Sequence, residues 1–289
     1  MSTGSVLVLG GPTAAGKTDL ALELARHHGA ALVSADAMQV YRGLDIGTAK
    51  PPPAVRAAFP HACMDVREVD EDYSVADFVD EVQRQRACAE RVLVVGGTPF
   101  WLAALVRPLA ALPAADPTVR AALAELADPW ARLAEVDPQA AARLHENDRV
   151  RVLRALEVHT LSGRPMSELW AEGPAQPPLA GAVAWLDRPD LRERIEQRLR
   201  QMMAAGYLDE VRALLARGHG PAQKPMRSLG YRHLGDHLRG LIPLEEAVRR
   251  TGRDTWRLAR KQRTWARGMG WPALDEAGVR AVVAAHWGR

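Results

Sequence analysis

Short apolar runs alternate with amphipathic segments over the first hundred residues. The runs "SVLVLGG" (5–11), "AALVSAD" (30–36) and "RVLVVGGT" (91–98) have the length and composition of strands buried on both faces of a sheet. The segments between them, "KTDLALELARHHG" (17–29) and "SVADFVDEVQRQRACAE" (74–90), have apolar residues at helical spacing. This alternation predicts an α/β fold with a parallel sheet flanked by helices.

After residue 112 the pattern changes. Asp-Pro pairs that begin at 116, 128 and 137 mark helix starts, and strand signals are almost absent up to the proline-rich "AEGPAQPPLAG". "AVAWLD" then predicts another strand, and "DLRERIEQRLRQMMAAG" a long helix. We therefore predict an α/β core whose first part spans 1–114, a helical insertion domain over 115–181, and core completion with a basic helical region over 182–289.

Composition indicates a globular, soluble protein. Of 289 residues 47% are hydrophobic and 25% charged, which are ordinary values. The longest uncharged run, "VLVVGGTPFWLAALV", falls short of the roughly 20 apolar residues that span a bilayer. Cys63 and Cys88 lack metal-binding spacing, and no signal-peptide pattern opens the chain. We expect a cytoplasmic protein with reduced thiols and no membrane partner.

Charge is unevenly distributed along the chain. Residues 1–190 hold 18 Lys and Arg against 25 Asp and Glu, a net −7, whereas residues 191–289 hold 20 against 10, a net +10. A basic C-terminal part indicates a polyanionic partner such as nucleic acid. Solvated arginine-rich helices would give the same count, so charge alone leaves both interpretations open.

A phosphate-binding loop follows the first predicted strand. Its sequence fits G-x-x-x-x-G-K-[ST] between a strand and a helix, which predicts a P-loop NTPase-like fold. Loop N–H groups and the helix N-terminus would bind phosphate oxygens, the lysine would add charge, and the threonine hydroxyl would hold Mg²⁺ as cofactor. The residues are Gly11, Pro12, Thr13, Ala14, Ala15, Gly16, Lys17 and Thr18.

The acidic residue expected of a P-loop hydrolase is missing. Such enzymes hold their metal with a carboxylate at the end of a later strand, but here the run ends in Gly96, Gly97 and Thr98. This favours group transfer over hydrolysis. Because ligands bind beyond the carboxyl ends of parallel strands, Lys17, Asp36 and Thr98 should share one edge of the sheet.

Several motifs together resemble one enzyme family. "GPTAAGKT", "DAMQVYRGLDIGTAKP", "VVGGTPFW", "DRVRVLRALEV", "RIEQR" and "RSLGYR" occur in the order found in tRNA dimethylallyltransferases, with the resemblance running from about residue 6 to about residue 268. The resemblance implies transfer of a dimethylallyl group from dimethylallyl diphosphate to the exocyclic N6 of the adenine beside the anticodon, in tRNAs that read codons beginning with U. It implies the tRNA anticodon stem-loop as partner, and we expect a monomer.

The resemblance also suggests catalytic residues. Asp36 is the candidate base for the weakly nucleophilic adenine amine, Thr98 borders the reaction channel, and Arg198 reaches the diphosphate. The alternatives are a helix cap or metal ligand for Asp36, a turn cap for Thr98, and a surface arginine for Arg198. Gln39 suits an adenine edge, although a structural glutamine remains open.

Contacts to tRNA are implied for a wider set of residues. The basic stretch "RRTGRDTWRLARKQRTWARG" interleaves cations with Trp256 and Trp265, as in phosphate contact with stacking, or as in an ordinary amphipathic helix. Ala37 replaces the usual serine of the family and Val150 the usual glutamine, which puts the side-chain contacts of the family at both positions in doubt. The implied set is Asp36, Ala37, Met38, Gln39, Thr98, Arg120, Val150, Arg151, Arg154 and Arg257.

Two other functions fit parts of this pattern. A P-loop small-molecule kinase would have the loop, Asp36 and a helical lid, but the basic C-terminal hundred residues are not typical of it. A non-catalytic RNA-binding protein with a vestigial loop would not need an intact Gly-Lys-Thr. The sequence leaves the accepted tRNAs, the order of substrate binding and the motion of the insertion open.

Overall fold

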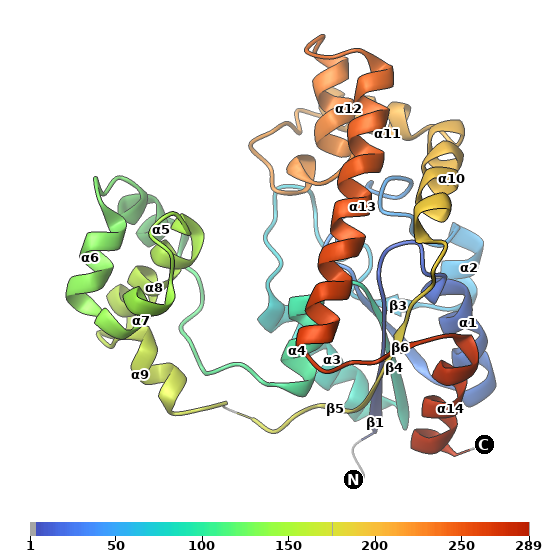
Figure 1. Ribbon diagram of the computed structural model, residues 1–289, viewed down its shortest axis with the longest axis horizontal. Coiled ribbons are helices and arrows are strands. Elements are labelled where there is room, and N and C mark those ends of the chain that lie inside the picture. Colours follow the sequence, from blue (N-terminus) through green and yellow to red (C-terminus); the bar gives the residue numbers. More distant parts are fainter. Residues whose placement is uncertain (1–3, 175, 289) are drawn as a thin grey trace. The chain divides into compact units, whose positions relative to one another are not determined.

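A computed structural model describes residues 4–174 and 176–288. The chain divides into two compact units, a core of Met1–Val106 with Leu179–Arg289 and a helical unit of Arg107–Pro178 (Figure 1). The helical unit thus begins before residue 115, which was the start predicted from the sequence for the insertion over 115–181. An isolated bridge between Ala110 and Pro174 pairs the two connecting segments, so both belong with the helices.

The core is built on a parallel sheet of six strands within the described residues, in the order β3-β2-β4-β1-β5-β6. This confirms the predicted fold class. The strands are β1 (Ser5–Gly10), β2 (Ala31–Ala35), β3 (His61–Ala62), β4 (Arg91–Gly96), β5 (Ala180–Leu186) and β6 (Ala273–Leu274).

Both faces of the sheet are buried, as the continuous apolar runs predicted. Along β1, Val6 and Val8 pack into one hydrophobic cluster, whereas Leu7 and Leu9 pack into another, because successive side chains point to opposite faces. The first cluster is covered by α3 (Val75–Cys88), α4 (Pro99–Val106), α11 (Tyr207–Ala216) and α12 (Tyr231–Leu238). The second is covered by α1 (Lys17–His28), α10 (Leu191–Ala204) and α14 (Glu276–Trp287).

The long helix α13 (Leu244–Gly268) contributes to both clusters, through Ala247 and Ala266 to the first and Ala259 to the second. The short α2 (Pro53–Ala58) and the 3-10 turn η1 (Pro225–Arg227) complete the core. Figure 1 shows α13 and α10 running beside each other above the carboxyl ends of the strands. These helices therefore border the edge at which a parallel sheet binds ligands.

The helical unit has a hydrophobic core of its own, which includes Leu133, Val152 and Leu156. Its helices are α5 (Pro117–Ala124), α6 (Pro129–Val136), α7 (Pro138–Arg143), α8 (Arg149–Ser162) and α9 (Met166–Ala171). The three predicted Asp-Pro starts are confirmed. In each, the aspartate side chain caps free N–H groups of the first turn and proline follows at the first helical position.

No helix in 4–174 or 176–288 combines the length and apolar character needed to cross a lipid bilayer.

Candidate active site

The phosphate loop joins β1 to α1. Gly16 adopts a φ of 94° at the N-cap of α1, a left-handed conformation that glycine reaches without strain. Within the loop, the Lys17 Nζ donates to the Pro12 carbonyl oxygen at 2.7 Å. From α10, Arg194 Nε donates to the Ala14 carbonyl oxygen at 2.8 Å and braces the loop from outside. The helix N-terminus thus opens toward an anion.

Two cations and one carboxylate lie close together beside this loop. Burial of its ammonium group, together with the nearby charge of Arg198, lowers the pKa of Lys17 to about 7, and the charge of Asp36 opposes this shift. The Lys17 residue as a whole is half-buried, and the part removed from solvent is the ammonium end of its side chain. Burial likewise lowers the pKa of Arg198, against the attraction of Asp36. The structure therefore brings Arg198, from α10, to the Lys17 and Asp36 that the sequence placed on one edge of the sheet.

Arg198 has a charge without a fixed partner. It lies on α10, and within the described residues its guanidinium forms neither a hydrogen bond nor an ion pair. Most other arginines of the core, such as Arg263 on Asp187 at 2.8 Å, are paired. A half-buried, unpaired guanidinium beside a phosphate loop is suited to an anionic ligand.

The ends of β2 and β4 are joined through Thr98. Its Oγ1 accepts the Ala37 N–H at 3.1 Å, and its own N–H donates to the Ala35 carbonyl oxygen at 3.1 Å. A Cβ on Gly96 would lie 2.2 Å from that same carbonyl oxygen. A carboxylate side chain therefore has no room at position 96, the last residue of β4.

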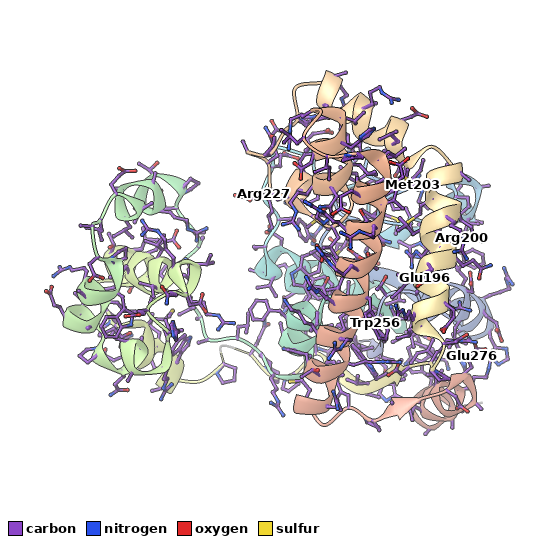
Figure 2. All side chains as sticks on the ribbon, turned by 45° about the horizontal axis from the view of Figure 1, so that its top comes forward. Glu196, Arg200, Met203, Arg227, Trp256 and Glu276 are labelled. Atoms are coloured by element: carbon purple, nitrogen blue, oxygen red, sulfur yellow. The ribbon has the colours of Figure 1, made fainter. Side chains whose placement is uncertain are left out.

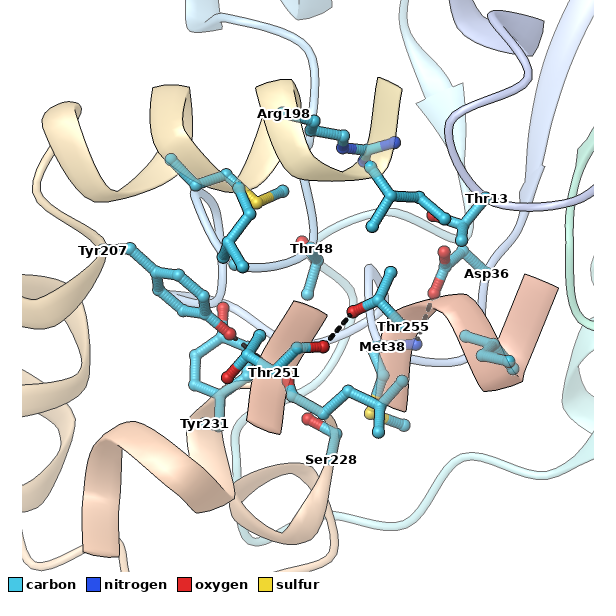
Figure 3. A pocket seen from close by; sticks show the side chains of 16 residues that line it. Thr13, Asp36, Met38, Thr48, Arg198, Tyr207, Ser228, Tyr231, Thr251 and Thr255 are labelled. Atoms are coloured by element: carbon cyan, nitrogen blue, oxygen red, sulfur yellow. Dashed lines mark hydrogen bonds between the residues drawn. The ribbon is translucent and has the colours of Figure 1, made fainter. Parts of the chain in front are cut away.

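Asp36 lies in the turn after β2. One carboxylate oxygen, Oδ1, accepts the Met38 N–H at 2.9 Å and fixes the side chain. Asp36 also lines a cavity of about 190 Å³, together with Thr13 and Arg198. Figure 3 shows these three residues gathered at one end of that cavity, with Tyr207 and Tyr231 at the other.

The walls of this cavity are mainly apolar. Polar groups at the Asp36 end and apolar side chains beyond it make a site for a ligand with a charged head and a hydrocarbon part. The lining includes Met38, Ile195, Leu199, Met202, Leu229 and Leu258, with Thr48, Ser228, Thr251 and Thr255. Thr98 is not part of the lining, although it positions the Asp36 turn.

A carboxylate holds the turn that lines the cavity opposite α10. Glu210 on α11 accepts the N–H groups of Asp45, Ile46 and Gly47 at 2.8, 2.6 and 3.0 Å, and the Tyr231 hydroxyl at 2.6 Å. Backbone N–H groups that converge in this way form an anion nest. This contact was not predictable from local sequence patterns, because its partners lie up to 165 residues apart in the chain.

Gln39 uses both ends of its side-chain amide within the protein. Its Oε1 accepts the Ser34 hydroxyl at 2.9 Å, and its Nε2 donates to the Thr48 carbonyl oxygen at 3.0 Å. This geometry favours the structural alternative for Gln39 over an adenine contact. The Ala37 N–H is likewise engaged, with Thr98, and the methyl side chain of Ala37 cannot form hydrogen bonds, so this residue offers a ligand no polar contact through either group.

In the helical unit, Arg120 and Arg154 share a buried partner. Both donate to Glu157 Oε2 at 2.7 Å, and hydrogen bonds from the two guanidinium groups hold the pKa of Glu157 below its usual value despite burial. Val150 is 81% exposed at the start of α8, and Arg151 pairs with Asp148 at 3.2 Å. Of the implied tRNA contacts in this unit, Val150 and Arg151 are therefore the most accessible.

The basic helix α13 presents most of its cations on one exposed face. Arg257 pairs weakly with Asp254 at 3.3 Å, whereas Arg263 turns inward to Asp187. Trp256 packs against the core between α13 and α10 (Figure 2), and Trp265 stacks edge-on against Trp271 at 5.4 Å. The two tryptophans are thus packing residues. The exposed cations are Arg253, Arg257, Arg260, Lys261 and Arg267.

Gln262 is a second residue of the site that the sequence motifs did not predict. Its Oε1 accepts the Thr13 N–H at 2.9 Å and its Nε2 donates to the Gly97 carbonyl oxygen at 2.6 Å. The available signal was an uncharged amide in a run of cations, three residues after Ala259 and four before Ala266, which is the spacing of a buried helix face.

A parallel sheet with this loop between β1 and α1 defines a P-loop NTPase-like fold. Residues 39–269 match the IPP transferase family, and the chain belongs to that family. It is 45% identical to a tRNA dimethylallyltransferase of Syntrophobacter fumaroxidans over 275 residues, which cover 91% of this chain and 80% of that protein. Identity to the tRNA dimethylallyltransferase of Halorhodospira halophila is 44%, over 92% of this chain and 91% of the relative.

A solved structure has the same architecture. The tRNA isopentenylpyrophosphate transferase of Staphylococcus epidermidis superposes with a TM-score of 0.66 at 28% sequence identity, over 95% of this chain and 94% of that one. The family resemblance drawn from the motifs is thereby confirmed.

Proposed function

We propose that this protein transfers a dimethylallyl group from dimethylallyl diphosphate to the exocyclic N6 of the adenine adjacent to the anticodon, in tRNAs that read codons beginning with U. Family membership supports the reaction. The structural observation that best supports this reaction is the cavity lined by Asp36 and the unpaired Arg198 beside the phosphate loop. Its apolar walls suit a branched five-carbon group, and its polar end suits a diphosphate.

The phosphate loop stabilises the leaving group in this proposal. As the bond between C1 and the diphosphate oxygen breaks, its electron pair goes to the diphosphate. The loop N–H groups, Lys17 and Arg198 surround this developing charge with fixed positive groups. A loop of the kind that binds nucleotide phosphates in other proteins thus binds the diphosphate leaving group here.

Asp36 acts on the other reactant. The adenine N6 forms the new bond to C1 and must lose a proton, which the Asp36 carboxylate accepts. Oδ1 is held by the Met38 N–H, leaving the second oxygen to meet the amine. Thr98 keeps this turn in place through the Ala37 N–H, so its proposed role is to position the base.

Mg²⁺ fits the donor set as a cofactor. The Thr18 hydroxyl forms no hydrogen bond within the described part of the chain and sits at the start of α1. Magnesium commonly takes one or two protein oxygens and completes its shell with phosphate oxygens and water. When bound, it would neutralise charge on the diphosphate.

We propose the anticodon stem-loop as the tRNA element that is bound. On the core, the exposed cations of α13 supply phosphate contacts, with Arg257 among them. In the helical unit, Arg120, Val150, Arg151 and Arg154 are the proposed contacts. The target adenine must leave its stack to reach Asp36, a step that RNA loops allow at low cost.

The proposed form is a cytoplasmic monomer. Light scattering of the purified protein would test the monomeric state.

Isotope transfer tests the proposal. The protein is incubated with undermodified tRNA and either dimethylallyl diphosphate labelled in the prenyl group or ATP labelled in the γ-phosphate. Prenyl label should enter RNA and be recovered on the adenine beside the anticodon. Phosphate transfer from ATP would point to the kinase alternative, which the comparisons do not favour, and no transfer from either donor would leave an RNA-binding protein.

A further inference from the structure

Gln262 ties the basic helix α13 to the phosphate loop through two hydrogen bonds. One joins it to the Thr13 N–H at 2.9 Å, and the other to the Gly97 carbonyl oxygen at 2.6 Å. The residue is only 5% exposed. A single side chain therefore connects the loop after β1 with the loop after β4.

The two partners fix how this amide must be oriented. An N–H group can meet only the Gln262 oxygen, and a carbonyl oxygen can meet only its NH₂ group. No other hydrogen bond to either backbone group occurs within the described residues. Loss of the amide would leave a half-buried donor and acceptor unpaired, which costs more than a typical hydrogen bond contributes.

Close packing makes the connection specific to glutamine opposite glycine. A Cβ on Gly97 would lie 2.6 Å from Gln262 Nε2 and 3.1 Å from the Gly11 carbonyl oxygen. Position 97 thus has room for this amide and for no side chain of its own. Gln262 thus bridges the two loops just beyond Gly10 and Gly96, the last paired residues of β1 and β4.

The remaining faces of α13 have separate tasks. Thr255 and Leu258 line the cavity beside Asp36, and Arg257, Arg260 and Lys261 are exposed. A change at Gln262 alters the loop but leaves the exposed cations where they are. Effects on donor binding and on RNA binding can therefore be separated.

We propose that Gln262 is a positioning residue for the diphosphate donor. It holds the first turn of the phosphate loop, at Thr13, so that the loop N–H groups and Lys17 face the leaving group. This inference rests on the proposed function, because it assumes that the loop binds the diphosphate of the donor.

The test measures inorganic pyrophosphate binding with Mg²⁺ by calorimetry. Gln262→Met keeps the length of the side chain but removes both hydrogen bonds, and it should raise the Kd for pyrophosphate about tenfold or more, equivalent to about 1.4 kcal/mol. The KM for dimethylallyl diphosphate should rise in parallel. The Kd for an anticodon stem-loop RNA should stay within about twofold of the wild-type value.

A second variant keeps the test decisive if Gln262→Met does not fold. Gln262→Glu still accepts the Thr13 N–H but sets a carboxylate against the Gly97 carbonyl oxygen and near the bound anion. It should weaken pyrophosphate binding at least as much. Ala266→Gly is the matched control, since it loosens α13 at a buried position one turn further on without touching the loop.

The outcomes separate this inference from the proposed function. Wild-type pyrophosphate affinity in Gln262→Met, or an equal loss in Ala266→Gly, would show that Gln262 does not position the loop. A wild-type protein that binds no pyrophosphate would overturn the proposed donor site as well. Weaker pyrophosphate binding with unchanged RNA binding, in the Gln262 variants only, supports the assignment.

Discussion

In the protein alone, the Lys17 ammonium group donates to the Pro12 carbonyl oxygen of its own loop, and burial lowers its pKa to about 7. The unfolded chain has the ordinary value of about 10.4, so it binds more protons between pH 7 and that value. The free energy of unfolding without ligand therefore gains a favourable contribution from Lys17 as pH rises through this window. Below pH 7 the buried, charged Lys17 therefore lowers the free energy of unfolding, and a bound anion would offset this loss.

Pyrophosphate binding should show this linkage. A bound anion stabilises the charged form, so complex formation takes up a proton above pH 7, and the affinity that Lys17 contributes should fall by up to about tenfold per pH unit. Lys17→Arg is the control, because arginine stays charged throughout and the titration of pyrophosphate itself affects both proteins alike. Calorimetry from pH 6 to 9 gives the ratio of the two Kd values. Parallel profiles would contradict a lowered pKa at Lys17.

Asp36 offers the sharpest test at a single residue. Asp36→Asn keeps the Oδ1 acceptor for the Met38 N–H, so the turn should stay folded. It removes the proton acceptor, and the single-turnover rate of prenyl transfer should fall by about 10²-fold or more. Pyrophosphate and tRNA affinities should change little. An unaltered rate would remove Asp36 from the proposed mechanism.

At the scale of elements, α11 determines the shape of the cavity through one carboxylate. Glu210 accepts the backbone N–H groups of residues 45–47 and the Tyr231 hydroxyl. Glu210→Gln sets an NH₂ group against some of these donors, leaving them unpaired. We expect a loss of about 1–3 kcal/mol in the free energy of unfolding, measured in urea.

The same variant should lower kcat/KM for dimethylallyl diphosphate, because Gly47 and Thr48 line the cavity. Asp209→Asn is the matched control on the same helix, where the side chain is exposed and pairs with Arg212. It should leave both stability and kcat/KM near wild type. Equal effects of the two variants would mean that stability and kcat/KM depend on the charge of α11 and not on the contact between Glu210 and residues 45–47.

How far the sequence could predict the fold depended on the reach of each interaction. β1, β2, β4 and the Asp-Pro helix starts follow from local patterns and were predicted. The two-residue strands β3 and β6 show no periodicity of their own and exist only through their neighbours in the sheet. Glu210 and Gln262 were missed for the same reason, since each acts on backbone groups more than 150 residues away in sequence.

At the scale of the whole molecule, charge separates by function. The C-terminal residues 191–289 carry a net +10, and much of this charge lies on the exposed face of α13. Other arginines of residues 191–289 form ion pairs within the protein, such as Arg263 with Asp187 and Arg280 with Glu23. The total charge therefore overstates what a nucleic acid can meet, and the face of α13 gathers five exposed cations on a single helix.

Arg257 tests whether this face binds RNA. It is 63% exposed, and its 3.3 Å contact with Asp254 is weak enough to exchange for a phosphate. Arg257→Ala should weaken binding of the anticodon stem-loop and reduce the slope of log K against log salt by about 1, because one fewer counterion is displaced. Arg192→Ala, on α10, removes a similarly exposed arginine paired with Glu196 at 3.6 Å and serves as control. If both variants keep the wild-type slope, α13 is an ordinary charged helix, whereas a change confined to Arg257 places the RNA backbone along it.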